Sequence, residues 1–281
     1  MNISSFKLLL FNSLIVLSSL CFLSLAPTIN SKPDRDKNLK TIKAQIEKLE
    51  CENPEMKAQF DGPIIPEMWF KRVDSDDIRI LYLLKNQIDV EGNDKGGGDL
   101  CAAKREYEDL EDVKWDGGLP THKPLVIISS MLENDLDYST AKEHSMSKEA
   151  FSLWKNMSAW VNVDKELTSG TWITDESKIR RAAQKNKALL RLQMNTYRPN
   201  VIICGNTCSL FLETTSTGYK FFDYLFSIND CRPIPSSNGR LYYFNQDVIV
   251  FDAYHPSARV SKEKYCDDIV TAVRKWLDER K

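Results

Sequence analysis

Four short apolar runs, separated by segments of helical spacing, constrain the fold of this chain most. Each run has the length and apolar composition of a buried strand. They cover residues 78–84, 160–163, 201–204 and 247–251. Strands joined through helices form a mainly parallel sheet with helices on both faces. The sequence therefore predicts an α/β protein, a three-layer α/β/α domain with a mainly parallel four-stranded central sheet.

The helices between and around these runs are predicted from periodicity and end signals. Apolar residues from Leu39 to Leu49 mark a first amphipathic helix that Asn53-Pro54 ends. Residues 175–196 are expected to form one long helix, and a further helix is expected after Thr207. Ser261 is the expected N-cap of a closing helix. Residues 101–150 are interpreted as an insertion or a peripheral helical region.

The N-terminus differs sharply in composition from the rest of the chain. Residues 8–26 carry no charge, Lys7 precedes them, and small residues stand near Ala26. This pattern predicts that residues 1–26 are a signal peptide or an N-terminal membrane anchor. A buried N-terminal helix or a misplaced start codon is the alternative. Residues 27–37 are then a linker, and 38–281 the folded domain. The chain is exported or membrane-anchored if the segment is a signal, and cytoplasmic otherwise.

Charge and cysteine content exclude several classes of protein. The 38 basic and 40 acidic residues give a net charge of −2, which disfavours a protein that coats nucleic acid. The six cysteines after Cys21 form no Cys-x-x-Cys pair, so buried thiols are favoured over a metal site, although disulfides are compatible with export. With three histidines in the chain, a His-rich metal centre is not expected either. Motifs for nucleotide triphosphates, dinucleotides and serine hydrolysis are absent.

Candidate functional residues follow the predicted strands. In parallel sheets, ligands bind beyond the carboxyl ends of the strands. His255, in His255-Pro256-Ser257, could donate to a developing anion, and Ser257 with nearby amides could hold a phosphate; a solvated turn is the alternative. Asn162 could read a planar amide edge through one donor and one acceptor, or could cap local backbone.

Taken in order, these segments resemble the uracil-DNA glycosylase superfamily, and most closely its poorly characterised bacterial glycosylase-like branch. The resemblance covers about residues 38–281. The order of the motifs carries more weight than any single one. The matching segments are Leu83-Leu84-Lys85-Asn86-Gln87 with the following loop, Asn162-Val163-Asp164-Lys165, residues 198–207 and residues 250–257.

The resemblance implies an edge of the sheet that accepts a nucleobase flipped out of DNA. By it, Asn162 would read the base, His255 would stabilise the departing base anion, and Pro256 and Ser257 would belong to a phosphate clamp. DNA or a nucleobase is the implied partner, the chain is expected to be a monomer, and no cofactor or metal is implied, since the four-cysteine iron–sulfur pattern of some branches is absent.

The first motif departs from the family pattern. Asn86 and Gln87 stand where the family has an acid, and an amide cannot act as a base near neutral pH. They remain candidate substrate contacts, and Asp89 is the candidate replacement for the acid.

Three functional hypotheses follow from these observations. The first is a DNA-repair-type hydrolase of N-glycosidic bonds, with His255 and Asp89 or an unaligned acid as catalytic residues. The second is a binding module that keeps the nucleobase pocket without its acid, which Asn86 and Gln87 favour. The third is an exported protein that uses the fold for another ligand, which residues 8–26 favour.

Overall fold

The computed structural model describes residues 32–52, 59–85, 88–89, 98–115, 119–166, 168–169, 175–215, 218–222, 234–235 and 240–280. Met1–Leu39 and Lys40–Lys281 are separate units. The expected signal or anchor, 1–26, lies outside the described residues. Helix α2 (Lys32–Glu52) begins six residues before the expected start of the domain, so residues 32–37 of the expected linker are helical. No helix in the described part of the chain combines the length and apolar character needed to cross a bilayer.

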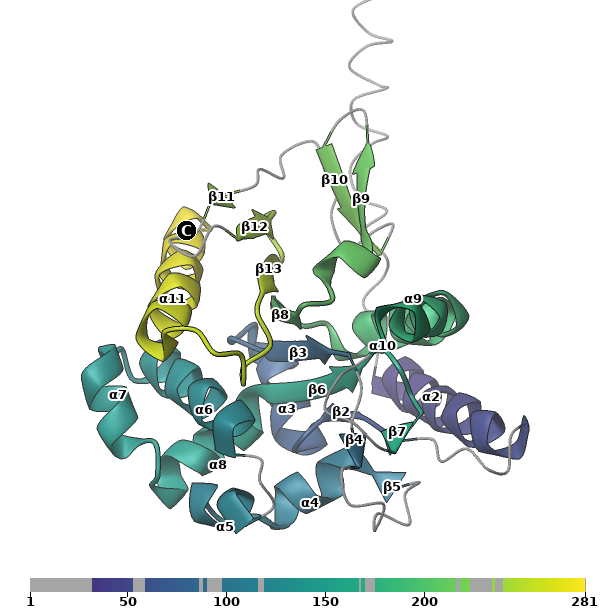
Figure 1. Ribbon diagram of the computed structural model, residues 1–281, viewed down its shortest axis with the longest axis horizontal. Coiled ribbons are helices and arrows are strands. Elements are labelled where there is room, and N and C mark those ends of the chain that lie inside the picture. Colours follow the sequence, from purple (N-terminus) through teal and green to yellow (C-terminus); the bar gives the residue numbers. More distant parts are fainter. Residues whose placement is uncertain are drawn as a thin grey trace, which may run out of the picture. The chain divides into compact units, whose positions relative to one another are not determined.

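Seven of the described strands form one mixed sheet (Figure 1). Its centre consists of four mutually parallel strands, which lie within or overlap the four apolar runs of the sequence. Antiparallel strands extend it at both edges. The α/β class is confirmed, but the sheet has more strands than the four expected. In spatial order the strands are β11 (Ile234–Pro235), β12 (Leu241–Phe244), β13 (Ile249–Ala253), β8 (Val201–Gly205), β3 (Ile80–Leu84), β6 (Ser158–Asn162) and β2 (Gly62–Pro63).

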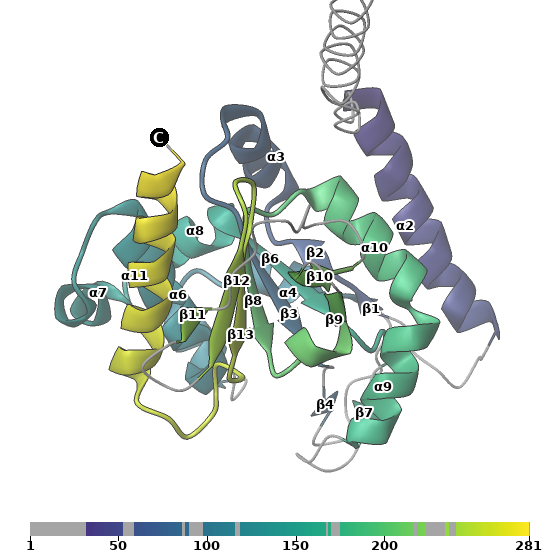
Figure 2. The ribbon, with the colours of Figure 1, turned by 90° about the horizontal axis from the view of Figure 1, so that it is seen from above.

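Helices lie on both sides of this sheet (Figure 2). On one side are α6 (Leu119–Glu133), α7 (Tyr138–His144), α8 (Lys148–Met157) and α11 (Lys262–Glu279). On the other are α9 (Glu176–Lys185) and α10 (Lys187–Tyr197). The shorter helices α3 (Pro66–Ser75), α4 (Leu100–Glu106) and α5 (Leu110–Trp115) complete the described set.

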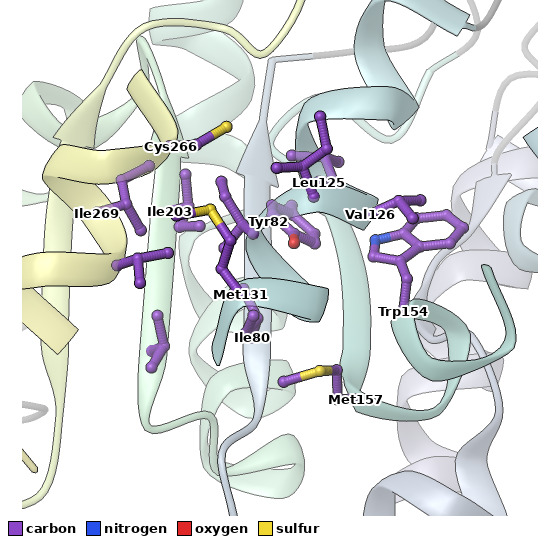
Figure 3. Packing of buried hydrophobic residues seen from close by; sticks show 14 of the residues in the cluster. Ile80, Tyr82, Leu125, Val126, Met131, Trp154, Met157, Ile203, Cys266 and Ile269 are labelled. Carbon is purple, nitrogen blue, oxygen red and sulfur yellow. The ribbon is translucent and has the colours of Figure 1, made fainter. Parts of the chain in front are cut away.

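The hydrophobic core lies between the sheet and the helices of the first side (Figure 3). Tyr82 and Ile203 of the strands face Leu125 of α6, Trp154 of α8 and Ile269 of α11. Each of these five side chains is at most 2% exposed. The described part of residues 101–150 is largely helical, as expected, but α6 is not peripheral, because its apolar residues form part of this core.

Two helix predictions differ from the structure. The helix expected over 175–196 is interrupted at Asn186, whose side-chain amide donates to the carbonyl of Val163 at 3.0 Å. After Thr207 the chain makes only the short 3₁₀ turn Cys208–Leu210 and then the hairpin of β9 (Leu212–Thr215) and β10 (Gly218–Phe221). Phe211 stacks on Phe222 at 4.1 Å between ring centroids, so aromatic packing closes this hairpin.

The expected N-cap and the expected thiols are confirmed where the structure describes them. The Ser261 hydroxyl accepts a hydrogen bond from the Lys264 amide at the start of α11. Four cysteine side chains in the described part of the chain are buried thiols, namely Cys101, Cys204, Cys208 and Cys266.

Candidate functional site

The order of the parallel strands has a switch point between β3 and β8. In the spatial order the chain passes from β3 to β6 toward one edge of the sheet, and from β8 to β13 toward the other. Ligands of open α/β sheets bind where neighbouring strands send their connections in opposite directions, which here is between β3 and β8. The Thr207 hydroxyl joins these two strands by donating to the carbonyl of Leu83 at 2.7 Å.

Gly205, the last residue of β8, allows three segments to approach one another at this edge. A Cβ atom on Gly205 would lie 2.5 Å from Leu84 Cδ2 and 3.4 Å from the Cα of His255. The loop after β13 therefore turns back over the end of β8 instead of extending away from the sheet. This places His255 beside the end of β8.

His255 is held in one tautomer by its neighbour. The Ser257 amide donates to its Nδ1 atom at 3.2 Å, and the Ser257 hydroxyl lies 2.7 Å from the same atom. An Nδ1 that accepts leaves the proton of the neutral ring on Nε2. Burial, together with the positive charges of Lys262 and Lys85, lowers the pKa of His255 to about 4. Near neutral pH the residue is therefore an uncharged hydrogen-bond donor through Nε2.

Lys262 fixes the loop that carries His255. Its ammonium donates to the carbonyl of Pro256 at 2.6 Å and also to that of Ala258. In this arrangement the amide and hydroxyl of Ser257 both contact His255. The part of Pro256-Ser257 in a phosphate clamp stays a prediction, because Ser257 would have to exchange these contacts for a phosphate.

Asn162 ends β6 at the same edge, opposite Leu84 in the register of the sheet. Its side chain is 1% exposed. Neither Oδ1 nor Nδ2 has a hydrogen-bond partner among the described residues. Its backbone amide donates to the carboxylate of Asp61 at 2.6 Å, so local backbone capping is not the role of this side chain.

A buried ionic network holds Asn162 in place. The carboxylate of Asp61 accepts from the Lys165 ammonium at 2.7 Å and from the Gln193 amide at 2.6 Å. The Asp61 and Lys165 side chains are both fully buried. Asp61 thus joins the end of β6 to Lys165 and to α10, and these contacts hold the end of β6 in place.

The residues of the first motif are described only in part. Asn86 and Gln87 lie outside the described residues. Asp89 belongs to the short strand β4 (Ile88–Asp89), where its backbone pairs with Ser169 of β7 (Thr168–Ser169). The expected roles of these three side chains stay predictions.

A second polar group lies at the ends of β8 and β13. The guanidinium of Arg240 lies 4.2 Å from the ring centroid of Tyr254 and donates to Asn206 Oδ1 at 2.8 Å. It also pairs with Asp252 at 3.3 Å. The sequence analysis missed Arg240, although it directly precedes the aromatic run Leu241–Phe244, whose composition favours a strand.

Asp164 is the most informative residue that the sequence analysis did not single out. It follows Asn162 by two residues, is 1% exposed, and its Oδ2 atom has no hydrogen-bond partner among the described residues. Burial raises the pKa of its carboxyl. The one signal available was its place just beyond a predicted strand.

The structure thus brings His255 and Ser257 into contact beside Gly205, and places Asn162 at the same edge. Neighbouring strands lie about 4.8 Å apart, so the ends of β6 and β8 are separated by about 10 Å, with β3 between them. Among the described residues no cluster of His, Cys, Asp and Glu is arranged to hold a metal ion.

The chain matches no family model and no curated protein.

Proposed function

We propose that this protein binds a nucleobase at the carboxyl edge of its sheet and hydrolyses the N-glycosidic bond of that base in DNA. The uracil-DNA glycosylase-like, three-layer α/β/α arrangement is part of the proposal. Its support is the set of four parallel central strands and the helices seen on both sides of the sheet. Fold similarity alone does not carry an activity, so the argument rests on the site.

The observation that carries the proposal is the buried, unsatisfied amide of Asn162. Leaving a buried polar group without a partner costs about 1–3 kcal/mol, so the Asn162 amide calls for a partner such as a water or a ligand. A side-chain amide offers a donor and an acceptor in one plane. Pyrimidine bases present the complementary pair on their Watson–Crick edge. A base bound at this edge would satisfy both atoms of Asn162 at once.

His255 suits the chemistry of the departing base. Cleavage of an N-glycosidic bond leaves the electron pair, and therefore a negative charge, on the base. A neutral imidazole stabilises such an anion by donating a hydrogen bond from its Nε2 atom. The hydrogen bond from the Ser257 amide fixes this tautomer in advance, so little reorganisation accompanies the reaction.

An abasic-site assay tests the proposal. The full chain, purified in mild detergent, is incubated with uracil-containing single-stranded and duplex oligonucleotides, followed by alkaline cleavage of abasic sites. We expect base release, and His255→Ala is expected to lower kcat about 10²–10³-fold, the usual loss for a donor to a developing anion. His144→Ala is the matched control, because His144 is exposed on α7 and distant in sequence from the site.

A binding module is the second candidate, favoured by Asn86 and Gln87 in place of an acid. Calorimetric titration with uracil and with uracil-containing oligonucleotides separates the two. Binding that Asn162→Ala abolishes, without base release by the wild type, would identify the binding module. Absence of both binding and release would contradict a nucleobase site of either kind.

A further inference from the structure

The segment after β6 continues alongside the segment after β3 beyond the last residues of the two strands. The Val163 amide donates to the carbonyl of Leu84 and the Asp164 amide to the carbonyl of Lys85, both at 2.8 Å. Asn86 and Gln87, the amides found where an acid is expected, come directly after Lys85 in the chain. Asp164 is therefore anchored beside Lys85, which directly precedes the two amides in the sequence.

The surroundings of Asp164 leave one carboxylate oxygen available. Its Oδ1 accepts from the Glu166 amide at 3.1 Å, whereas Oδ2 is buried and has no hydrogen-bond partner among the described residues. The nearest cation is the Lys178 ammonium on α9, at 3.7 Å from Oδ2. An unsatisfied carboxylate oxygen of this kind is ready to accept a proton from a water or a substrate.

Two other described acids near this edge have cationic partners. Glu166 pairs with Lys185 at 3.3 Å, and Asp252 pairs with Arg240 at 3.3 Å. Asp164 differs from both because it is almost fully buried and its closest ion-pair contact is longer. Asp164 is therefore better suited to proton transfer than Glu166 or Asp252.

We propose that Asp164 is the general base of the reaction given under "Proposed function", on which this inference rests. Its carboxylate accepts a proton from a water molecule as the water oxygen bonds to C1′ of the sugar. The C1′–N bond breaks, and its electron pair leaves with the base, whose anion accepts a hydrogen bond from His255 Nε2–H. The base anion then takes up one proton from solvent and Asp164 returns its proton to solvent, so the products are the free base and an abasic sugar. Asp164 thus supplies the carboxylate that Asn86 and Gln87 do not.

The electrostatics of the site agree with this role. Burial raises the pKa of Asp164, while the Glu166 amide and the Lys178 ammonium oppose the rise, and the Glu166 carboxylate adds to it. A base whose pKa lies closer to the working pH transfers protons more effectively than an exposed aspartate. The acidic limb of the kcat–pH profile should therefore report this carboxyl.

Kinetics of four forms of the full chain test the inference. These are the wild type, Asp164→Asn, Asp89→Asn and the charge control Asp247→Asn, which changes an exposed residue. We expect Asp164→Asn to lower kcat at least about 10²-fold with little change in KM, and to remove the acidic limb, because general-base catalysis contributes about 10²–10⁴-fold. Asp247→Asn should stay within about threefold of the wild type. Asp89→Asn shows whether the candidate acid of the first motif activates the water instead of Asp164.

Stability separates this role from a structural one. A folded-state pKa above the unfolded value means that ionising Asp164 costs stability at neutral pH, so Asp164→Asn should melt no lower than the wild type. If it fails to fold, Asp164→Ala with added formate replaces it, and formate should restore turnover.

Two results would overturn the inference. If Asp164→Asn retains wild-type kcat while Asp89→Asn loses it, Asp89 activates the water. The proposed function is then retained, and the role of Asp164 as general base is wrong. If the wild type releases no base from any substrate, the proposed function and this inference fail together.

Discussion

At the scale of single residues, the site depends on polar groups that burial keeps in unusual states. His255 is neutral, the amide of Asn162 lacks protein partners among the described residues, and Asp164 holds its proton more tightly than an exposed aspartate would. Each state weakens the fold slightly and prepares a group for a ligand. The free energy of unfolding should therefore depend on pH, and this dependence can be predicted without knowing the substrate.

His255 should make the protein less stable as the pH falls from about 6.5 to about 4. Above this window the ring is neutral in both states, and within it the unfolded chain takes up the proton first, because the folded-state pKa is about 4. Replacing His255 with Gln removes the effect. Urea unfolding at pH 7 and pH 4.5 measures the free energy of unfolding. The value for the variant should rise relative to that of the wild type at the lower pH. Parallel pH dependence of the wild type and the variant would contradict the assignment.

At the scale of elements, buried ionic contacts hold the short strand β2 in place, because its own backbone pairing is too short to do so. β2 has only two residues, and Asp61, which directly precedes it, contacts β6, α10 and Lys165. Breaking a buried pair by removing one partner leaves an uncompensated charge, which is far more costly than losing an exposed pair.

We expect Asp61→Ala to lower the free energy of unfolding by about 3–5 kcal/mol, because it leaves the Lys165 ammonium buried without its carboxylate. Chemical denaturation measures the loss. The double variant Asp61→Ala/Lys165→Met should recover a substantial part of it. Glu67→Ala, which breaks an exposed pair with Lys71, should change stability by less than about 1 kcal/mol. A loss as small as that of Glu67→Ala would show that the buried pair does not support the fold.

The success of sequence-based prediction differed among the elements for physical reasons. The parallel strands were found because strands buried on both faces are continuously apolar, as in Val201–Gly205. β2 was missed because its two residues form a strand only by pairing with β6. The helix expected after Thr207 was wrong, since contacts among Phe211, Phe221 and Phe222 override local helical spacing.

The same limit applies to the site. His255 was recognisable because it follows a predicted strand, and Asn162 because it lies near the end of one. The importance of Asp164 depends on its burial and on its contact with Lys85, neither of which can be read from neighbouring residues in the sequence. The network of Asp61, Lys165 and Gln193 joins residues more than 25 positions apart, so no local sequence pattern predicts it.

At the scale of the whole molecule, the function has to be reconciled with the apolar N-terminal segment. Residues 8–26 carry no charge, and the sequence predicts a signal or an anchor there. An enzyme acting on DNA outside the cytoplasm would meet foreign or released nucleic acid, not the chromosome. Location therefore decides which substrates are relevant.

Fractionation of cells that express the tagged full chain tests this prediction. We expect the protein in the membrane or exported fraction, and we expect Ile15→Arg to shift it to the soluble cytoplasmic fraction, since a charge within an inserted segment costs about 2.5–3.5 kcal/mol. Equal distribution of the two forms in the soluble cytoplasmic fraction would exclude a targeting role for residues 1–26.

The two outermost strands of the described sheet have a consequence for crowded solutions. Gly62–Pro63 and Ile234–Pro235 are each two residues long and end in proline, which has no amide hydrogen to donate. Long, flat edges recruit further strands and lead to fibres, whereas short edges that contain proline do not. Growth of the sheet from one molecule into the next is therefore blocked at both borders, and the folded protein should tolerate high concentration without polymerising through its sheet.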